Sequence, residues 1–310
     1  MLIFVTKRLF SMIITMIVVS LLVFALLEMD GSAVADRVLG PYAVETQRHL
    51  WLEAHGYLRP ASVRYFEWLG HVVTGDLGES LRYKAPVADI LARRLASTGL
   101  LAFWAMFFIV SLGVICGICA GMKEGSLTDR AVSILSIVST SLPEFASAVF
   151  LTAIFVYALR WLPGTSGMVN GFDGWQLILP VTTLVLYGFG YIARMTRASM
   201  VDVMRQVYIR TALLKGLPYH TVVLKHALRN ALITPFTIIV LQINWLISGV
   251  VVVEYSFSYK GFGALILEAA LNHDVYLLQG CAMVAVLIAV TTQFIADVGY
   301  TYLNPRIRFS

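Results

Sequence analysis

Long apolar stretches separated by polar ones dominate the pattern of this 310-residue chain. The apolar stretches cover residues 9–27, 95–122, 131–159, 175–193, 230–253 and 275–296. A helix rises 1.5 Å per residue, so even the shortest stretch, with 19 residues, reaches about 28 Å, close to the thickness of a bilayer core. We therefore predict an all-α integral membrane protein with six transmembrane helices.

Two features inside these stretches bear on how the helices pack. Gly113, Gly117 and Gly121 recur at every fourth position, which predicts a helix face that another helix approaches closely. Pro143 removes a backbone hydrogen bond and predicts a kink within the third stretch. The neighbouring Glu144 is costly in lipid, and two interpretations stay open: it faces a transport path, or it is a solvated carboxylate near a water-facing surface.

The distribution of lysine and arginine predicts the orientation of the helices. Thirteen of these residues lie in the N-terminal lead, the loop at 123–130, the stretch 194–229 and the C-terminal end, against two in the short loops of the other side. Loops rich in lysine and arginine stay in the cytoplasm, so we expect both termini there. Residues 30–94 are then an extracytoplasmic segment, and their aromatic content indicates a folded cap.

The predicted division of the chain has three parts. Residues 1–29 form a cytoplasmic lead and the first transmembrane helix, and residues 30–94 form the extracytoplasmic segment. Residues 95–310 form a five-helix core.

The composition excludes several other classes of protein. Hydrophobic residues make up 59% of the chain and charged residues 13%, and the mean hydropathy is +0.80, whereas about a quarter of a soluble domain is charged. The net charge of +5 is weak support for nucleic-acid binding. Cys116 and Cys119 form a C-x-x-C, but a zinc site needs about four ligands and no further cysteine or histidine pair accompanies them. The six histidines match no metal motif, so we predict no metal site.

Residues 208–235 stand out because they are polar and basic between two apolar stretches. Ile209, Ala212 and Leu213 fall on one face of a first short helix, and Val222, Val223, Ala227 and Leu228 supply an apolar stripe on a second. Gly216 between them suits the left-handed conformation that closes a helix, and Pro218 suits the first turn of the next one. The pattern predicts a bent, rigid, amphipathic pair of helices that a protein partner can grip.

The residues in this loop carry a family resemblance. Residues 208–212, Lys215-Gly216, residues 226–231 and Pro235 resemble the EAA loop of ABC importer permeases, in the variant of the dipeptide, oligopeptide and nickel class. Residues 64–69, 75–80, 128–130 and 254–263 and the terminal Asp297 with residues 304–308 are similar to the same class. Residues 29–32 and Leu213, Leu214 and Lys260 depart from its pattern.

The resemblance implies a coupling helix that seats in a cleft of a separate ATPase subunit. The residues to which it gives this role are Arg210, Thr211, Ala212, Lys215, Gly216, Leu217, Pro218, His226, Arg229, Asn230 and Pro235. It also implies a bacterial inner-membrane location, a second homologous permease, two ATP-binding subunits and an extracytoplasmic solute-binding protein. Whether the second permease is a distinct chain or another copy stays open, as does the substrate: a dipeptide, an oligopeptide, a nickel chelate or a sugar.

The chain lacks the motifs of an enzyme. None of its six lysines follows a glycine, so it has no P-loop, and neither H-E-x-x-H nor G-x-S-x-G occurs. We therefore expect a transport subunit that binds no cofactor, with ATP and magnesium used by partner subunits. The alternative is a secondary transporter driven by an ion gradient, which predicts several buried ionisable residues in the spans. The candidates for a path or gate are Glu144, Gln242, Asn244 and Glu254.

Overall fold

The computed structural model describes residues 2–29, 31–40, 42–168 and 171–303. These residues form helices and connecting loops, with no strand among them beyond a single β-bridge between Glu79 and Pro86. The helices are α1 (Leu2–Leu27), α2 (Gly31–Leu39), α3 (Glu45–Ala54), α4 (Ala61–Thr74), α5 (Val87–Met122), α6 (Leu127–Ser141), α7 (Glu144–Thr152), the π-helical η1 (Ala153–Ala158), α8 (Gly174–Met204), α9 (Val207–Leu214), α10 (Tyr219–Thr221), the π-helical η2 (Val222–Ala227), α11 (Leu228–Ala231), α12 (Ile233–Ser256), α13 (Phe262–Leu271) and α14 (Val275–Leu303).

The predicted membrane-spanning character is confirmed. Within the described residues, four continuous segments are long and apolar enough to cross a membrane: Val5–Leu27, Val87–Met122, Gly174–Met204 and Val275–Val298. Two further candidates are broken helix pairs, Leu127–Ser141 with Glu144–Ala158 and Tyr219–Ala231 with Ile233–Ile243, which bend by 102° and 48°. Counting each pair as one span gives up to six spans, so six remains the upper count.

The third apolar stretch is broken rather than kinked, and this corrects the sequence expectation. Leu142 and Pro143 are both extended, with ψ of 122° and 146°, between the end of α6 and the start of α7. Proline disfavours the helical conformation of the residue before it, so the helix ends there instead of bending through it. The 102° angle between the two halves follows from these two extended residues.

Two predicted loops are helical in the structure. Asp129 and Arg130, expected in a polar loop, lie in the first turns of α6, because the Ser126 hydroxyl caps that helix by accepting from the Asp129 N–H. The stretch 254–274, which connects the last two predicted transmembrane helices, contains α13, a ten-residue apolar helix. The motif expected at residues 304–308 lies outside the described residues.

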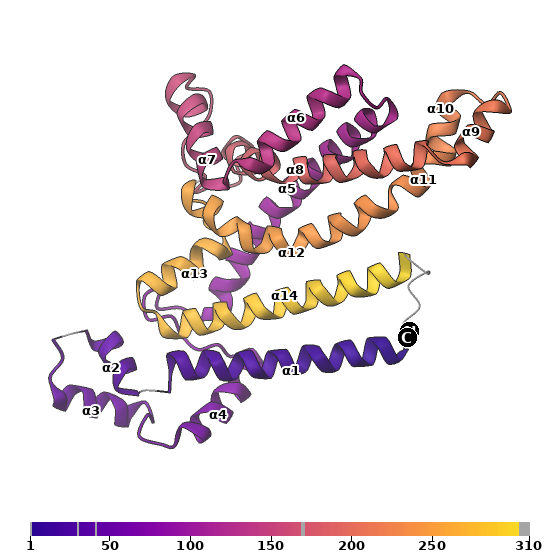
Figure 1. Ribbon diagram of the computed structural model, residues 1–310. Helices are drawn as coiled ribbons and strands as arrows, with labels where there is room; N and C mark the ends of the chain where they lie inside the picture. Colours follow the sequence, from indigo (N-terminus) through magenta and orange to yellow (C-terminus); the bar gives the residue numbers. More distant parts are fainter. Residues whose placement is uncertain (1, 30, 41, 169–170, 304–310) are drawn as a thin grey trace. The chain divides into compact units, whose positions relative to one another are not determined.

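The chain forms two compact units, which Figure 1 draws in one view. The first contains the chain up to Thr98 and Lys260–Ile295, and the second contains Gly99–Tyr259 and the chain from Ala296. In the first unit, the start of α5 packs on α13 and α14 through Val87, Leu91, Leu265 and Leu277.

Residues 30–94 are folded, as the sequence predicts, wherever the structure describes them. Their helix α4 is fastened to α1 in two ways: the Tyr65 hydroxyl lies 2.8 Å from that of Ser20, and Arg64 Nη1 donates to the Glu28 carbonyl at 2.9 Å. Both contacts join residues more than thirty positions apart, so this segment packs on α1.

Helix α8 is the centre of the second unit, where α6, α7 and α12 all pack on it. The glycine face of α5 also lies against α8, which confirms its predicted role. A Cβ atom added at Gly117 would lie 2.5 Å from the Cβ of Thr196 and 2.6 Å from the Ala193 carbonyl oxygen. A Cβ atom added at Gly113 would likewise be too close to Ile192, and one added at Gly121 too close to Met200. The backbones of α5 and α8 therefore approach more closely than any side chain allows.

Gly117→Ala is expected to lower the free energy of unfolding by about 1–3 kcal/mol, because the added methyl group overpacks a contact with no free space. Gly99 offers a matched control in the same helix, since a Cβ there meets no atom within 4 Å. Gly99→Ala should stabilise the helix by up to about 1 kcal/mol through its higher helix propensity. Thermal unfolding in detergent measures both changes, and shifts of the same sign would contradict the close approach.

Candidate functional site

The polar loop after α8 forms the bent helical pair that the sequence predicts. Gly216 has a φ of +79°, in the left-handed region, and so confirms the predicted helix stop. Its N–H donates to the Leu213 carbonyl at 3.0 Å, and the Leu217 N–H donates to the Ala212 carbonyl at 3.4 Å. This pattern is a Schellman motif, which satisfies the last carbonyls of α9 and reverses the chain direction.

The second arm consists of α10, η2 and α11, and it differs from the expected α-helix in two respects. Pro218 lies at the N-cap of α10, one position before the first helical residue, where its ψ of 139° is non-helical. Residues Val222–Ala227 are π-helical, a form that occurs mostly as short segments and often at functional positions.

Small and branched apolar side chains hold the two arms together against the end of α8. Ile209 and Ala212 of α9 pack with Val222, Val223, Ala227 and Ala231 of the second arm and with Met200 of α8. The predicted apolar stripes are thus confirmed except at Leu213, which is 40% exposed. Figure 1 shows α9 and α10 side by side beyond the end of α8, next to α11.

Three hydrogen bonds connect the loop internally and to neighbouring helices. Asn230 Nδ2 donates to the Tyr208 hydroxyl at 2.8 Å and so joins the two arms. The Tyr219 hydroxyl donates to the Met122 carbonyl at the end of α5, at 2.9 Å. The Ser199 hydroxyl of α8 donates to the Ala231 carbonyl at 2.8 Å. The loop is therefore attached to α5 and α8 together.

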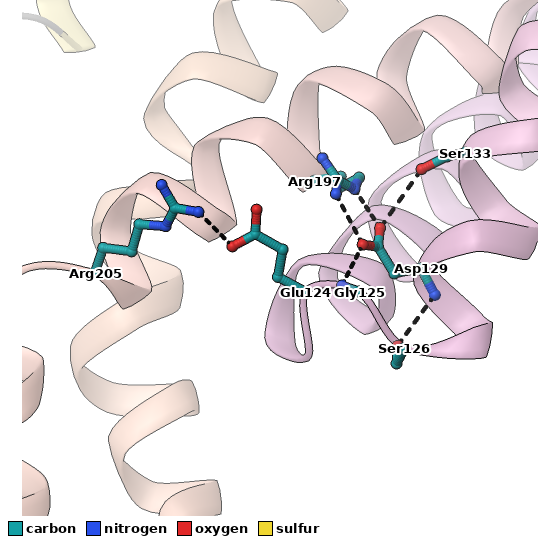
Figure 2. Close-up of polar contacts among 7 residues, drawn as sticks. All are labelled: Glu124, Gly125, Ser126, Asp129, Ser133, Arg197 and Arg205. Carbon is teal, nitrogen blue, oxygen red and sulfur yellow. Dashed lines mark hydrogen bonds and ion pairs between the residues drawn. The ribbon is translucent and has the colours of Figure 1, made fainter.

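Two ion pairs fix the neighbouring turn between α5 and α6 to the same end of α8 (Figure 2). The Arg197 guanidinium binds both carboxylate oxygens of Asp129, with 2.8 Å between Nη2 and Oδ2. The Gly125 N–H donates to the same Oδ2 at 2.8 Å. Arg205 Nη2 donates to Glu124 Oε2 at 2.6 Å. The Asp129 side chain is 5% exposed and that of Arg197 27%, so the first pair is the less exposed of the two.

The Asp129–Arg197 pair was not predicted from the sequence, although both residues were noted in polar segments. A carboxylate near the start of one helix and an arginine near the end of another were the only signals, and many pairs of charged residues satisfy them. Because 68 positions separate the two residues, no local spacing rule joins them.

The outer surface of the loop carries exposed apolar side chains next to exposed lysine and arginine side chains. Val207 and Leu214 are 79% and 80% exposed, and Leu224 is 63% exposed. Of the residues with a predicted coupling role, Ala212 and Pro235 are buried, and the following are exposed: Arg210, Thr211, Lys215, Gly216, Leu217, Pro218, His226, Arg229 and Asn230. Large apolar side chains exposed beside cations are typical of a surface that a protein partner covers.

The residues predicted for a path or gate lie on two helices that pack against each other, α7 and α12. Glu144 is the half-buried first residue of α7. Gln242 and Glu254 are buried in α12, and the Asn244 side chain lies outside the described part of the structure. Burial of Gln242 agrees with a polar contact between helices, and the path assignment stays a prediction.

Comparison with known proteins establishes the family. Residues 96–309 match the family described as binding-protein-dependent transport system inner membrane component. The chain belongs to this family. A probable peptide ABC transporter permease of Sinorhizobium fredii is 33% identical over 99% of both chains. A glutathione transport system permease of Shigella flexneri is 35% identical over the full length of both, and a putative peptide transport system permease of Brucella abortus is 35% identical over 98% of both.

A solved structure supports the fold. The crystal structure of an amino acid ABC transporter with histidines aligns with 69% of this chain and 94% of its own, at 14% identity and a TM-score of 0.52. The predicted resemblance is thus confirmed: this protein is an inner-membrane permease of the peptide class of ABC importers, and as a permease component it is a multi-pass transport subunit.

Proposed function

We propose that this permease forms half of a translocation path and couples to separate ATPase subunits through the loop at 208–235. The observation that carries the proposal is the exposed apolar face of Val207, Leu214 and Leu224 on a helical pair fastened to α5 and α8. In this proposal the loop lies in the cytoplasm, where the surplus of lysine and arginine favours it. Closure of the ATPases moves the loop, and the hydrogen bonds to Met122 and Ser199 carry the displacement into the membrane helices.

The proposed assembly contains a second homologous permease, two ATP-binding subunits and an extracytoplasmic binding protein that delivers the solute. ATP and magnesium act on the partner subunits. We propose small peptides, including glutathione-like ones, as the substrate class, because relatives that align over nearly the whole chain are named for peptide and glutathione transport.

Leu214→Asp tests the coupling surface. A charge in the middle of an apolar contact is expected to cost about 2 kcal/mol, or roughly thirty-fold in the affinity for the ATPase subunits. Leu214 is 80% exposed, so the permease itself should remain folded and in the membrane at its usual level. Co-purification of ATPase activity in gentle detergent and uptake of labelled dipeptide measure the effect.

Leu214→Met is the matched control, since it keeps an apolar side chain of similar size, and it should retain ATPase binding and uptake. If Leu214→Asp also retains both, the loop is not the coupling surface. If the isolated permease accumulates solute on a proton or sodium gradient without companion subunits, the importer assignment is wrong and the ion-driven alternative is right.

A further inference from the structure

A basic cleft lies in the first unit. It has a volume of about 280 Å³ and is lined by Tyr83, Ile90, Arg93, Arg94, Ser97 and Lys260. Three of these six side chains are cationic, and they come from α5 and from the residue two positions before α13. Segments far apart in the sequence thus bring positive charge to one place.

Two hydrogen bonds hold the Arg94 guanidinium in place beside this cleft. Its Nη2 donates to Glu268 Oε2 at 3.2 Å and to the Tyr83 hydroxyl at 3.3 Å, and Tyr83 in turn donates to Glu268 at 2.5 Å. The Arg94 Nη1 atom is buried and makes no hydrogen bond within the described residues. Because Nη1 has no exposed surface, Arg94 contributes to the cleft through its positive charge.

The charges around the cleft leave it positive. Glu268 offsets one of the three cations, while Arg93 and Lys260 are exposed at its edge. Burial and the Glu268 carboxylate raise the pKa of Tyr83, so its hydroxyl remains protonated at neutral pH and adds no negative charge.

The position of the cleft along the helices indicates the source of the anion. Arg93 and Arg94 directly precede the charge-free stretch 95–122 of α5, and Lys260 stands just before the apolar α13. Cations at the ends of apolar helices lie at the depth of lipid headgroups, and Ile90 with the methylene stems of the basic side chains gives the cleft an apolar wall.

We propose that this cleft binds the phosphodiester headgroup of an anionic phospholipid. The phosphate oxygens face the positive charge of Arg93, Arg94 and Lys260, whose side chains line the cleft. The apolar wall accommodates the glycerol backbone and the first methylenes of an acyl chain, which a free phosphate ion lacks.

The test measures lipid retained by the full-length chain. The purified chain in detergent is given phosphatidylglycerol or phosphatidylcholine, and bound lipid is counted by native mass spectrometry. Wild type should retain phosphatidylglycerol preferentially. Arg93→Gln and Lys260→Gln should each lower its retention about fivefold, since one surface cation contributes about that factor to binding an anionic lipid. Both side chains are exposed, so folding should be unaffected.

Arg82→Gln is the matched control, because Arg82 is an exposed cation of the same segment that does not line the cleft. It should retain phosphatidylglycerol as wild type does. Equal retention of the two lipids by wild type, or wild-type retention by the Arg93→Gln/Lys260→Gln double variant, would overturn the proposal. Displacement of the lipid by millimolar inorganic phosphate would assign the cleft to a free anion instead. If the Arg93→Gln/Lys260→Gln double variant loses uptake but retains lipid as wild type does, the cleft would be assigned to an acidic protein surface.

Discussion

Arg197→Ala should lower the free energy of unfolding by about 1–3 kcal/mol, the cost of leaving the buried Asp129 carboxylate without its charged partner. The Asp129 carboxylate is 5% exposed and would keep the Gly125 N–H but lose both guanidinium bonds. Because this pair joins the start of α6 to α8, the loss should also loosen the turn beside the coupling loop. Thermal unfolding of the permease in detergent measures the change as a fall in Tm.

Arg205 provides the control for this prediction. It pairs with Glu124 at the same end of α8, but the two side chains are 67% and 47% exposed. An exposed pair contributes about 0–1 kcal/mol, so Arg205→Ala should change Tm little. The Asp129→Ala/Arg197→Ala double variant should recover part of the loss, because no buried charge is then left alone. Equal falls in Tm for Arg197→Ala and Arg205→Ala would refute the role of burial.

Gly216→Pro should reduce uptake to background while the chain stays in the membrane. Proline fixes φ near −65°, whereas this position has +79°, and it removes the N–H that donates to Leu213. The conflict costs about 3 kcal/mol or more, enough to open the Schellman motif and separate the two arms. Uptake of labelled dipeptide and binding of the ATPase subunits report the effect.

The control at the same position is Gly216→Asn. A Cβ there would meet nothing within 4 Å, so the backbone conformation alone restricts the choice of residue. Asparagine tolerates the left-handed region and should keep most of the uptake. A proline variant that transports like the asparagine variant would show that the bend is not needed for coupling.

Much of this fold could be predicted because its signals are local. An apolar stretch long enough to cross a bilayer, a glycine at every fourth position and the Gly216 stop each depend on residues close together in the sequence. The same holds for the two apolar stripes of the coupling loop, where only Leu213 lies on the wrong side.

The features that the sequence did not predict are of two kinds. They depend on contacts between residues far apart in the chain, or on whether a proline bends a helix or ends it. Pro143 indicates an interruption, but the 102° turn arises because Leu142 is also extended, and the two halves, α6 and α7, then each pack on α8. The Asp129–Arg197 pair requires α6 and α8 to be in place first. Glu144, Gln242 and Glu254 are placed on helices α7 and α12. In the proposed assembly a second permease forms the other half of the path, so the role of these residues depends on surfaces that this sequence does not contain.

The contact between α5 and α8 limits how this transporter changes shape. Ile192, Thr196 and Met200 of α8 occupy the space that Gly113, Gly117 and Gly121 leave open, so neither helix can slide without meeting the larger side chains next to each glycine. In the proposed transport cycle we therefore expect α5 and α8 to move as one rigid body. The surfaces that open and close around the solute should then belong to helix pairs with larger side chains between them, where a change of rotamer can absorb the motion.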